Sequence, residues 1–191
     1  MEITAGILHG MALRAPAGLD VRPTAVRARQ ALFDSLGDLS GKVFADLCAG
    51  SGAMGLEAAS RGASSVVFAE CAPASLAAIR SNCRKAAEAG LTAEMKIVEG
   101  PLPNSVTRLA AAPKPDIVFA DPPYPVSSEL LSAITGDARF AEWAAGAVLI
   151  WELPAERRGL KPPGPAWRIL SIRTLGPADF LFMTGKEAAG R

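Results

Sequence analysis

The regular alternation of apolar, strand-like runs with helical segments after Gly41 constrains the fold most strongly. There are five apolar runs, residues 42–47, 64–70, 93–100, 115–120 and 145–153. Turns and helical segments separate them, and the longest helical segments are residues 73–90 and 127–144. Parallel strands need crossover connections, which are usually helices, so this pattern predicts an α/β fold with a parallel sheet covered on both faces. Residues 166–176 and 178–185 are two further apolar runs joined by a short turn. They predict an antiparallel hairpin that completes a mostly parallel, seven-stranded sheet.

The chain of 191 residues has the length of one domain with its own core. Residues 3–15 are short apolar runs broken at Gly6 and Gly10, which predicts a small β-hairpin. Thr24 can cap a helix whose apolar residues recur at helical spacing up to Leu36. We therefore predict an N-terminal hairpin extension over residues 1–23 and the main domain over residues 24–191.

Charge and cysteine content exclude several classes of protein. Lys and Arg number 20 against 19 Asp and Glu, which is not the strongly basic balance of a typical nucleic-acid binder. No apolar run is long enough to cross a bilayer, and the first residues show no signal peptide. The three cysteines form no CxxC pair, which argues against a disulfide framework or a metal site. We expect a cytoplasmic protein, without a membrane or metal partner, and a monomer.

A glycine-rich turn follows the first strand of the alternating region. Its glycines, Gly50, Gly52 and Gly55, match G-x-G-x-x-G and would let a ligand approach bare backbone at a helix N-terminus. By itself this pattern also fits a dinucleotide-binding enzyme, or a tight turn without a ligand. Two acids favour a different ligand. Asp46 precedes the turn, where it would repel a pyrophosphate but could pair with a cationic amino acid, and Glu70 ends the next strand, where it could accept both ribose hydroxyls. A cationic amino acid joined to a ribose describes S-adenosyl-L-methionine.

A rigid turn, Asp121-Pro122-Pro123-Tyr124, follows the fourth strand directly. Two prolines fix the backbone and end the strand at the sheet edge where ligands bind. The Asp121 carboxylate and the Pro122 carbonyl could accept the hydrogens of an exocyclic base amine, which directs its lone pair toward a methyl donor. Tyr124 could stack on an extruded base. The alternative interpretation is a structural turn with a solvated acid and a core tyrosine.

Taken together, DLCAGSGAMGLEAASRGA and DPPY resemble the Rossmann-like class I methyltransferases that modify exocyclic amines. The segments AGILHGMAL, VRPTAVRARQALFDSL and TLGPADFLFM extend this resemblance over nearly the whole chain to the bacterial 16S rRNA guanine-N2 methyltransferases of the RsmD family. The resemblance implies methyl transfer from S-adenosyl-L-methionine to the N2 amine of a guanine in 16S rRNA. As a hypothesis, the substrate is a partly or fully assembled small ribosomal subunit.

The resemblance also implies roles for individual residues. The catalytic residues would be Asp121, Pro122 and Tyr124. The cofactor would be bound by Asp46, Ala49, Gly50, Ser51, Gly52, Glu70, Cys71, Gly100, Pro101 and Leu102. RNA would be contacted by Arg22, Thr24 and Arg27, for which the alternative is a helix cap with solvated arginines that include Arg29. Where the family often carries an acid that binds adenine, this chain has Gly100 and Pro101, and Glu99 stands at a shifted position. Backbone and Leu102 would then hold the adenine.

Other functions share parts of this pattern. Methylation of adenine or cytosine amines in DNA keeps the chemistry, but 191 residues leave no separate target-recognition segment. A protein glutamine substrate suits the DPPY turn but not the RPT head. A non-catalytic RNA-binding assembly factor would not need an intact Asp121 or glycine turn. A dehydrogenase would need an acid–base residue, and the sole histidine, His9, lies in the head hairpin.

Overall fold

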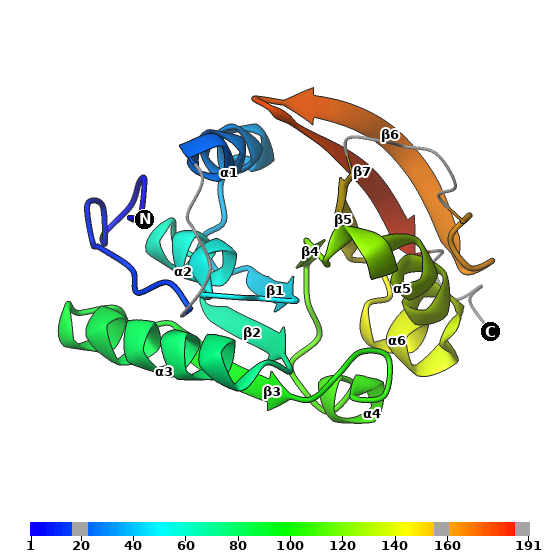
Figure 1. Cartoon of the computed structure of the whole chain (residues 1–191), viewed down its shortest axis with the longest axis horizontal. Coiled ribbons are helices and arrows are strands. Elements are labelled where there is room, and N and C mark those ends of the chain that lie inside the picture. The colour runs from blue at the N-terminus through cyan, green and yellow to red at the C-terminus, as the bar shows by residue number, and fades with distance from the viewer. Residues whose placement is uncertain (17–22, 155–160, 186–191) are drawn as a thin grey trace.

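The computed structural model describes residues 1–16, 23–154 and 161–185, and among these the strands form one seven-stranded sheet (Figure 1). The strand order is β3-β2-β1-β4-β5-β7-β6. The strands are β1 (Val43–Leu47), β2 (Ser65–Glu70), β3 (Glu94–Glu99), β4 (Ile117–Ala120), β5 (Val148–Leu153), β6 (Trp167–Leu175) and β7 (Ala178–Gly185). Strands β1 to β5 pair in parallel, whereas β7 is antiparallel to both β5 and β6. This confirms the predicted α/β fold, its mostly parallel sheet and the terminal hairpin.

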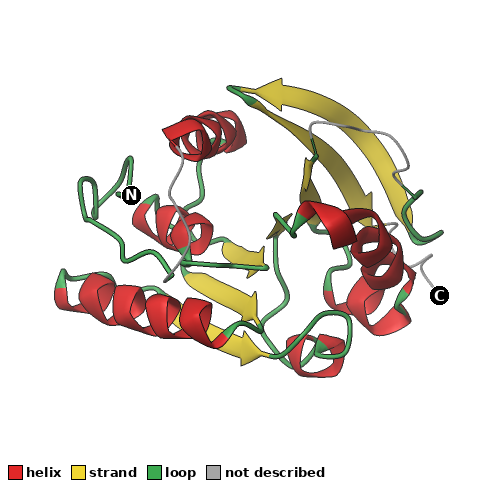
Figure 2. Cartoon of the chain, viewed as in Figure 1, coloured by secondary structure: helices red, strands yellow, loops and turns green. Residues whose placement is uncertain are grey.

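Helices cover both faces of the sheet (Figure 2). They are α1 (Pro23–Leu36), α2 (Ala53–Ser60), α3 (Pro73–Glu88), α4 (Val106–Leu109), α5 (Tyr124–Gly136) and α6 (Ala138–Trp143). The first three pack with the N-terminal segment in one apolar cluster, and the last three pack in a second cluster on the opposite face. None of the helices in the described parts of the chain has the length and apolar character needed to cross a membrane.

The central strands are buried on both faces. All four residues of β4 are buried, and so are all residues of β2 except its last, Glu70. Strands buried in this way read as continuous apolar runs, which is why the sequence pattern located them. The two acids in β1 and β2, Asp46 and Glu70, are therefore exceptions to the composition of these strands, and both lie near their carboxyl ends.

The segment 127–144, expected to be one helical stretch, is divided into α5 and α6. Asp137 lies between them, and its side chain accepts hydrogen bonds from the backbone N–H groups of Arg139 (2.8 Å) and Phe140 (3.4 Å). An aspartate in this position caps a new helix N-terminus. The chain can therefore change direction at Asp137 without leaving those N–H groups unpaired.

Residues 1–16 fold back onto the first apolar cluster. Glu2 and Ala12 form an isolated antiparallel bridge, and the side chains of Ile3 and Leu8 are buried in the same core as α1 and α2. Gly6 lies so close to α2 that a Cβ atom there would be 1.8 Å from the Ser60 carbonyl oxygen. The Ser60 hydroxyl donates to the Ala5 carbonyl (2.6 Å). The N-terminal segment is thus fixed to the end of α2; the expected domain boundary at residues 23 and 24 stays a prediction.

A buried group of charged side chains joins the N-terminal segment, α1 and α2. The Glu57 carboxylate is fully buried and accepts hydrogen bonds from the Thr4 N–H (2.9 Å), the Thr4 hydroxyl (2.6 Å) and the Arg61 Nε (2.9 Å). Arg29, which is 4% exposed, places its Nε 3.3 Å from Glu57 and donates from its terminal nitrogen to the Glu2 carbonyl. The interpretation of Arg29 as a solvated arginine is therefore wrong. Its charge is buried because α1 packs against α2 at this point.

Gly55 allows α2 to lie directly on β2. A Cβ atom at this position would be 2.3 Å from Cε1 of the buried Phe68 and 2.6 Å from Cγ1 of Val66. We expect Gly55→Ala to lower the free energy of unfolding by about 1–3 kcal/mol, the usual cost of overpacking a core. Urea denaturation measures this change. Gly136→Ala is the matched control, because a Cβ at this helical glycine meets nothing within 4 Å. A loss of stability in Gly136→Ala equal to that in Gly55→Ala would contradict the packing argument.

Candidate functional site

The residues singled out in the sequence meet at one edge of the sheet. Strands β2, β1 and β4 are neighbours and run in parallel, so their carboxyl ends lie side by side. The glycine-rich turn leaves β1, Glu70 ends β2, and Asp121 follows β4. Figure 1 shows this edge in the middle of the molecule, between α2 and α5. In open α/β sheets, ligands bind at this edge.

The backbone of the glycine-rich turn adopts left-handed conformations at three positions. Cys48 has φ 58°, Gly50 has φ 56° and Gly52 has φ 77°. The Gly52 N–H closes the turn by donating to the Ala49 carbonyl (2.7 Å), and the Ala49 N–H donates to the Ala69 carbonyl on β2 (3.2 Å). A Cβ atom at Gly50 would meet nothing within 4 Å. Hydrogen bonds within the turn and to β2 therefore fix its backbone, while the space beside Gly50 is open to a ligand.

Asp46 lies beneath this turn and is 1% exposed. Its Oδ2 accepts a hydrogen bond from the Gly55 N–H (2.9 Å) in the first turn of α2. Burial raises the pKa of the Asp46 carboxyl well above its ordinary value, the Gly55 hydrogen bond opposes this rise, and the nearby charges of Glu70 and Asp121 add to it. Asp46 is thus a support of the turn as well as a buried acid.

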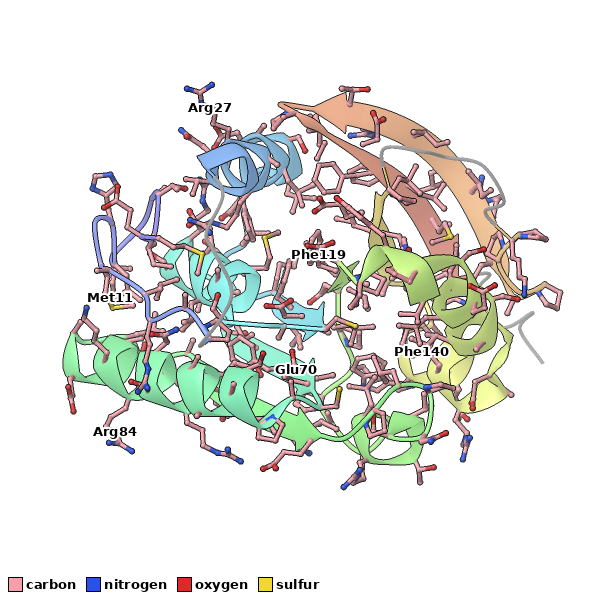
Figure 3. All side chains as sticks on the ribbon, viewed as in Figure 1. Met11, Arg27, Glu70, Arg84, Phe119 and Phe140 are labelled. Atoms are coloured by element: carbon pink, nitrogen blue, oxygen red, sulfur yellow. The ribbon has the colours of Figure 1, made fainter. Side chains whose placement is uncertain are left out.

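Glu70 connects the glycine-rich turn to the start of α3. Its Oε2 accepts from the Gly50 N–H (2.8 Å), and its Oε1 accepts from the N–H groups of Cys71 (2.7 Å) and Ala72 (2.9 Å). Figure 3 shows Glu70 at the end of β2, close to the helix that follows. The structure thus brings Glu70, Gly50 and Cys71 together: the Cys71 backbone N–H donates to Glu70, and its exposed thiol also interacts with the Glu70 carboxylate.

The electrostatic character of the site is negative. Burial raises the pKa of the Cys48 thiol to about 12, and the charges of Glu70, Asp46 and Asp121 contribute to this shift. A thiol with such a pKa is protonated at neutral pH and is not a nucleophile. Within the part of the chain that the structure describes, no group of three or more His, Cys, Asp or Glu side chains could hold a metal ion. The charges of Glu70, Asp46 and Asp121 favour a positively charged ligand at this edge.

The loop after β3 borders the same edge. The Gly100 N–H donates to the Glu70 carbonyl (2.9 Å), and the Ser105 hydroxyl donates to the Gly100 carbonyl (3.1 Å). Pro101 is exposed, and Leu102 is partly buried against the second apolar cluster. The displaced acid, Glu99, forms an ion pair with Arg80 of α3. Gly100 is therefore placed beside Glu70 by the backbone, and Glu99 is engaged with α3.

The DPPY turn presents side chains with different exposure. Pro122 is buried, Asp121 is exposed, and Tyr124 begins α5 with half of its surface (50%) exposed. The first turn of α5 is attached to β5 by a buried hydrogen bond from the Trp151 Nε1 to the Ser127 hydroxyl (2.9 Å). Tyr124 is thus not a core residue, so that alternative interpretation is wrong for its side chain.

Sequence reasoning missed several polar residues that support this site. Trp151 packs in the second apolar cluster, and its hydrogen bond to Ser127 joins positions 24 residues apart. Asn82 of α3 is buried and contacts the backbone at Ser51 and Arg14. Neither contact has a local signal in the sequence, because each depends on how a helix packs against another segment.

The residues expected to contact RNA are placed in part. Arg27 is exposed on α1, and Figure 3 shows its side chain extending away from the sheet. The turn between β6 and β7 packs beside it, since a Cβ at Gly176 would be 3.3 Å from the Arg27 carbonyl oxygen. The backbone of Thr24 belongs to α1, but its side chain lies outside the described residues, as does Arg22.

Comparisons with known proteins agree with this arrangement. The family model described as Conserved hypothetical protein 95 matches residues 1–182. The Bacillus subtilis (strain 168) protein named "Putative rRNA methyltransferase YlbH" is 30% identical over 129 residues, which are 65% of this chain and 67% of that protein. A solved structure titled "Putative methyltransferase yhhF from Escherichia coli" has a TM-score of 0.74 at 26% identity, covering 98% of this chain and 99% of that one. A hypothetical protein of Thermus thermophilus has a TM-score of 0.68 at 29% identity, with 97% and 99% covered. These matches and the two turns at one sheet edge show that the chain belongs to the Conserved hypothetical protein 95 family, the RsmD-type methyltransferases.

Proposed function

We propose that this methyltransferase transfers a methyl group from S-adenosyl-L-methionine to the exocyclic N2 amine of a guanine in 16S rRNA. The observation that carries the proposal is the meeting of three carboxylates, Asp46, Glu70 and Asp121, with an open glycine turn at one sheet edge. A negative site raises the affinity for a cation, and the sulfonium and ammonium groups of this cofactor are cations. The resemblance of the head and of the DPPY turn to the guanine-N2 methyltransferases supports the amine substrate.

The residues of the site fit this cofactor. Gly50 has open backbone, which allows close approach of a ligand, and Glu70 holds the turn while its carboxylate remains at the end of β2 for ribose hydroxyls. Asp46 is a buried acid, and a positive charge nearby would stabilise its carboxylate against the cost of burial. When bound, S-adenosyl-L-methionine supplies an electrophilic methyl group. The backbone at Gly100 and Leu102 would border the adenine.

The DPPY turn would handle the amine. The Asp121 carboxylate and the Pro122 carbonyl accept the two amine hydrogens, which directs the nitrogen lone pair toward the methyl carbon. When bound, the donor would supply the methyl group with its sulfur as the leaving group. The amine nitrogen would accept the methyl group and release one proton, for which Asp121 would be the acceptor. The half-exposed ring of Tyr124 offers a stacking surface for the base. Orientation and electrostatics account for the rate in such a displacement.

Evidence for an RNA substrate comes from a relative and from residues outside the DPPY turn. The name of the Bacillus subtilis relative gives rRNA as the substrate of that protein. In this chain, Arg27 is exposed on α1 near the β6–β7 turn, where it could contact phosphate. The formal net charge is only +1, so shape and a local surface would have to supply specificity. This supports an assembled or partly assembled small subunit as the substrate.

Methyl transfer from labelled S-adenosyl-L-methionine tests the proposal directly. The substrates are naked 16S rRNA and partly assembled small subunits, both unmethylated and from the source organism. Digestion to nucleosides identifies the product, and we expect N2-methylguanosine. Label in adenine or cytosine of DNA, or in a protein glutamine, would replace the proposed substrate. Cofactor binding without label in any of these would favour a non-catalytic assembly factor.

Cofactor affinity should depend on pH through Asp46. A bound cation stabilises the carboxylate, so the pKa of Asp46 is lower in the complex than in the free protein, where burial raises it. Binding then releases a proton, and affinity increases as pH rises from the bound-state pKa to the free-state pKa, by at most about tenfold per pH unit. Above the free-state pKa the affinity levels off. Calorimetric titration with S-adenosyl-L-methionine measures both affinity and proton release.

The matched variant for this pH dependence is Asp46→Asn. It removes the titrating group and keeps an oxygen that can accept from the Gly55 N–H. We expect its cofactor affinity to be weaker and to lose most of the pH dependence. The neighbouring acids Glu70 and Asp121 remain in this variant, so an unchanged pH profile would assign the dependence to them.

A further inference from the structure

Asn82 connects the glycine-rich turn to the N-terminal segment. It lies on α3, is 1% exposed, and uses its whole amide group. Its Oδ1 accepts from the Arg14 N–H (2.8 Å), while its Nδ2 donates to the Arg14 carbonyl (3.0 Å) and to the Ser51 carbonyl (2.9 Å). One side chain thus contacts two segments that are separated by more than thirty residues in the sequence.

An asparagine is well suited to this position. The contact needs one acceptor and two donors in a single plane, which a primary amide supplies. An aspartate of the same shape would place a carboxylate oxygen against two carbonyl oxygens. An aliphatic side chain would remove the partner of three backbone groups, one of them at a buried contact and two at partly buried contacts. The contact therefore depends on amide chemistry and not on the volume of the side chain.

The glycine-rich turn and the N-terminal segment lie next to the two proposed ligands, the cofactor and RNA. The Ser51 carbonyl is in the turn closed by the hydrogen bond from the Gly52 N–H to the Ala49 carbonyl, so fixing it fixes the backbone that faces the cofactor. Arg14 is an exposed basic residue of the N-terminal segment, and that segment is joined to α1, which carries the exposed Arg27, by the hydrogen bond from Arg29 to the Glu2 carbonyl. A second link from α3, from the Lys85 ammonium to the Ala12 carbonyl (2.7 Å), holds the same segment but does not touch the turn.

We propose that Asn82 is a positioning residue that couples cofactor binding at the glycine-rich turn to RNA binding through the N-terminal segment. The inference rests on the proposed function, because it takes the cofactor and RNA as the two ligands. A cofactor that orders the turn also orders residues 12–16 through Asn82, so each ligand strengthens the binding of the other. By linkage, the factor by which the cofactor tightens RNA binding equals the factor by which RNA tightens cofactor binding.

The experiment measures RNA affinity with and without S-adenosylhomocysteine, the non-reacting product. The probe is whichever of naked 16S rRNA or the partly assembled small subunit accepts label. For the wild-type protein we expect saturating S-adenosylhomocysteine to tighten RNA binding by about fivefold or more. In Asn82→Ala and Asn82→Asp we expect the ratio of RNA affinities with and without S-adenosylhomocysteine to fall to about one, even where the variant can still be saturated with S-adenosylhomocysteine. The control Lys85→Met should keep the wild-type ratio, because it loses only the link to Ala12.

Hydrogen exchange provides a measurement that needs no variant. S-adenosylhomocysteine should slow exchange of the backbone amides of residues 12–15 in the wild-type protein, although these residues lie outside the glycine-rich turn. Three results would overturn the coupling: a wild-type ratio of one, a ratio that survives in a folded Asn82→Ala protein, or unchanged exchange at residues 12–15. Failure of the proposed function is a different result, namely no methyl transfer to any RNA, and exchange at residues 12–15 does not report it.

Discussion

Asp121→Ala is expected to lose at least about 100-fold in kcat for methyl transfer while its affinity for S-adenosyl-L-methionine stays within a few-fold of wild type. The carboxylate is proposed to act on the substrate amine. Because Asp121 is exposed, solvent screens its attraction for the cofactor, so its main contribution is to the reaction. Its position supports this division, since Asp121 follows β4, whereas the glycine-rich turn and Glu70 belong to β1 and β2. Single-turnover transfer of label measures the rate, and calorimetry measures cofactor affinity.

Two further variants serve as controls for Asp121→Ala. Asp121→Asn keeps an oxygen that can accept one amine hydrogen, so it should retain more activity than Asp121→Ala. Glu142→Ala removes an exposed carboxylate from α6, which packs with the second apolar cluster away from the glycine-rich turn, and should leave kcat unchanged. Equal losses of cofactor affinity and kcat in Asp121→Ala would instead indicate that Asp121 supports the fold of the site.

Glu57→Ala is expected to lower the free energy of unfolding by about 3–5 kcal/mol. The substitution would leave the buried Arg29 guanidinium without its carboxylate and would remove the acceptor for the N–H and hydroxyl of Thr4. Burial already lowers the pKa of Arg29, and the Glu57 charge opposes that shift. A buried charge that loses its partner is costly because neither water nor protein then solvates it. Chemical denaturation followed by circular dichroism measures the loss.

A second substitution separates the charge effect from the packing effect. Replacing both partners, as Arg29→Met with Glu57→Leu, removes both charges and should recover part of the stability that Glu57→Ala loses. The exposed Glu142→Ala again serves as the control and should change stability by less than about 0.5 kcal/mol. If the double variant were less stable than Glu57→Ala, the loss would have to come from the hydrogen bonds of Thr4 and Arg61 and not from an unpaired Arg29.

The sequence by itself determined the architecture of this protein and the residues at its edge. The runs that form β1, β2 and β4 are mostly apolar, with Asp46 and Glu70 as the acidic exceptions. Parallel strands are buried on both faces, so the composition of each run indicates its environment. The glycine-rich turn and the DPPY turn were recognisable because glycine and proline restrict the backbone locally. Their meeting at one edge follows from parallel pairing, which places all carboxyl ends together.

Only the tertiary structure decided the environment of the polar side chains. The pattern around Arg29 is that of an exposed helix face, yet the side chain is buried because Glu57, 28 residues later, lies opposite it once α1 packs on α2. The same holds for Asn82, which meets Ser51 and Arg14, and for Trp151, which meets Ser127. Buried apolar residues recur with the period of the helix or strand that carries them, so a short stretch of sequence is enough to predict their burial. A hydrogen bond or ion pair between distant residues leaves no such period, because it exists only after the elements have packed.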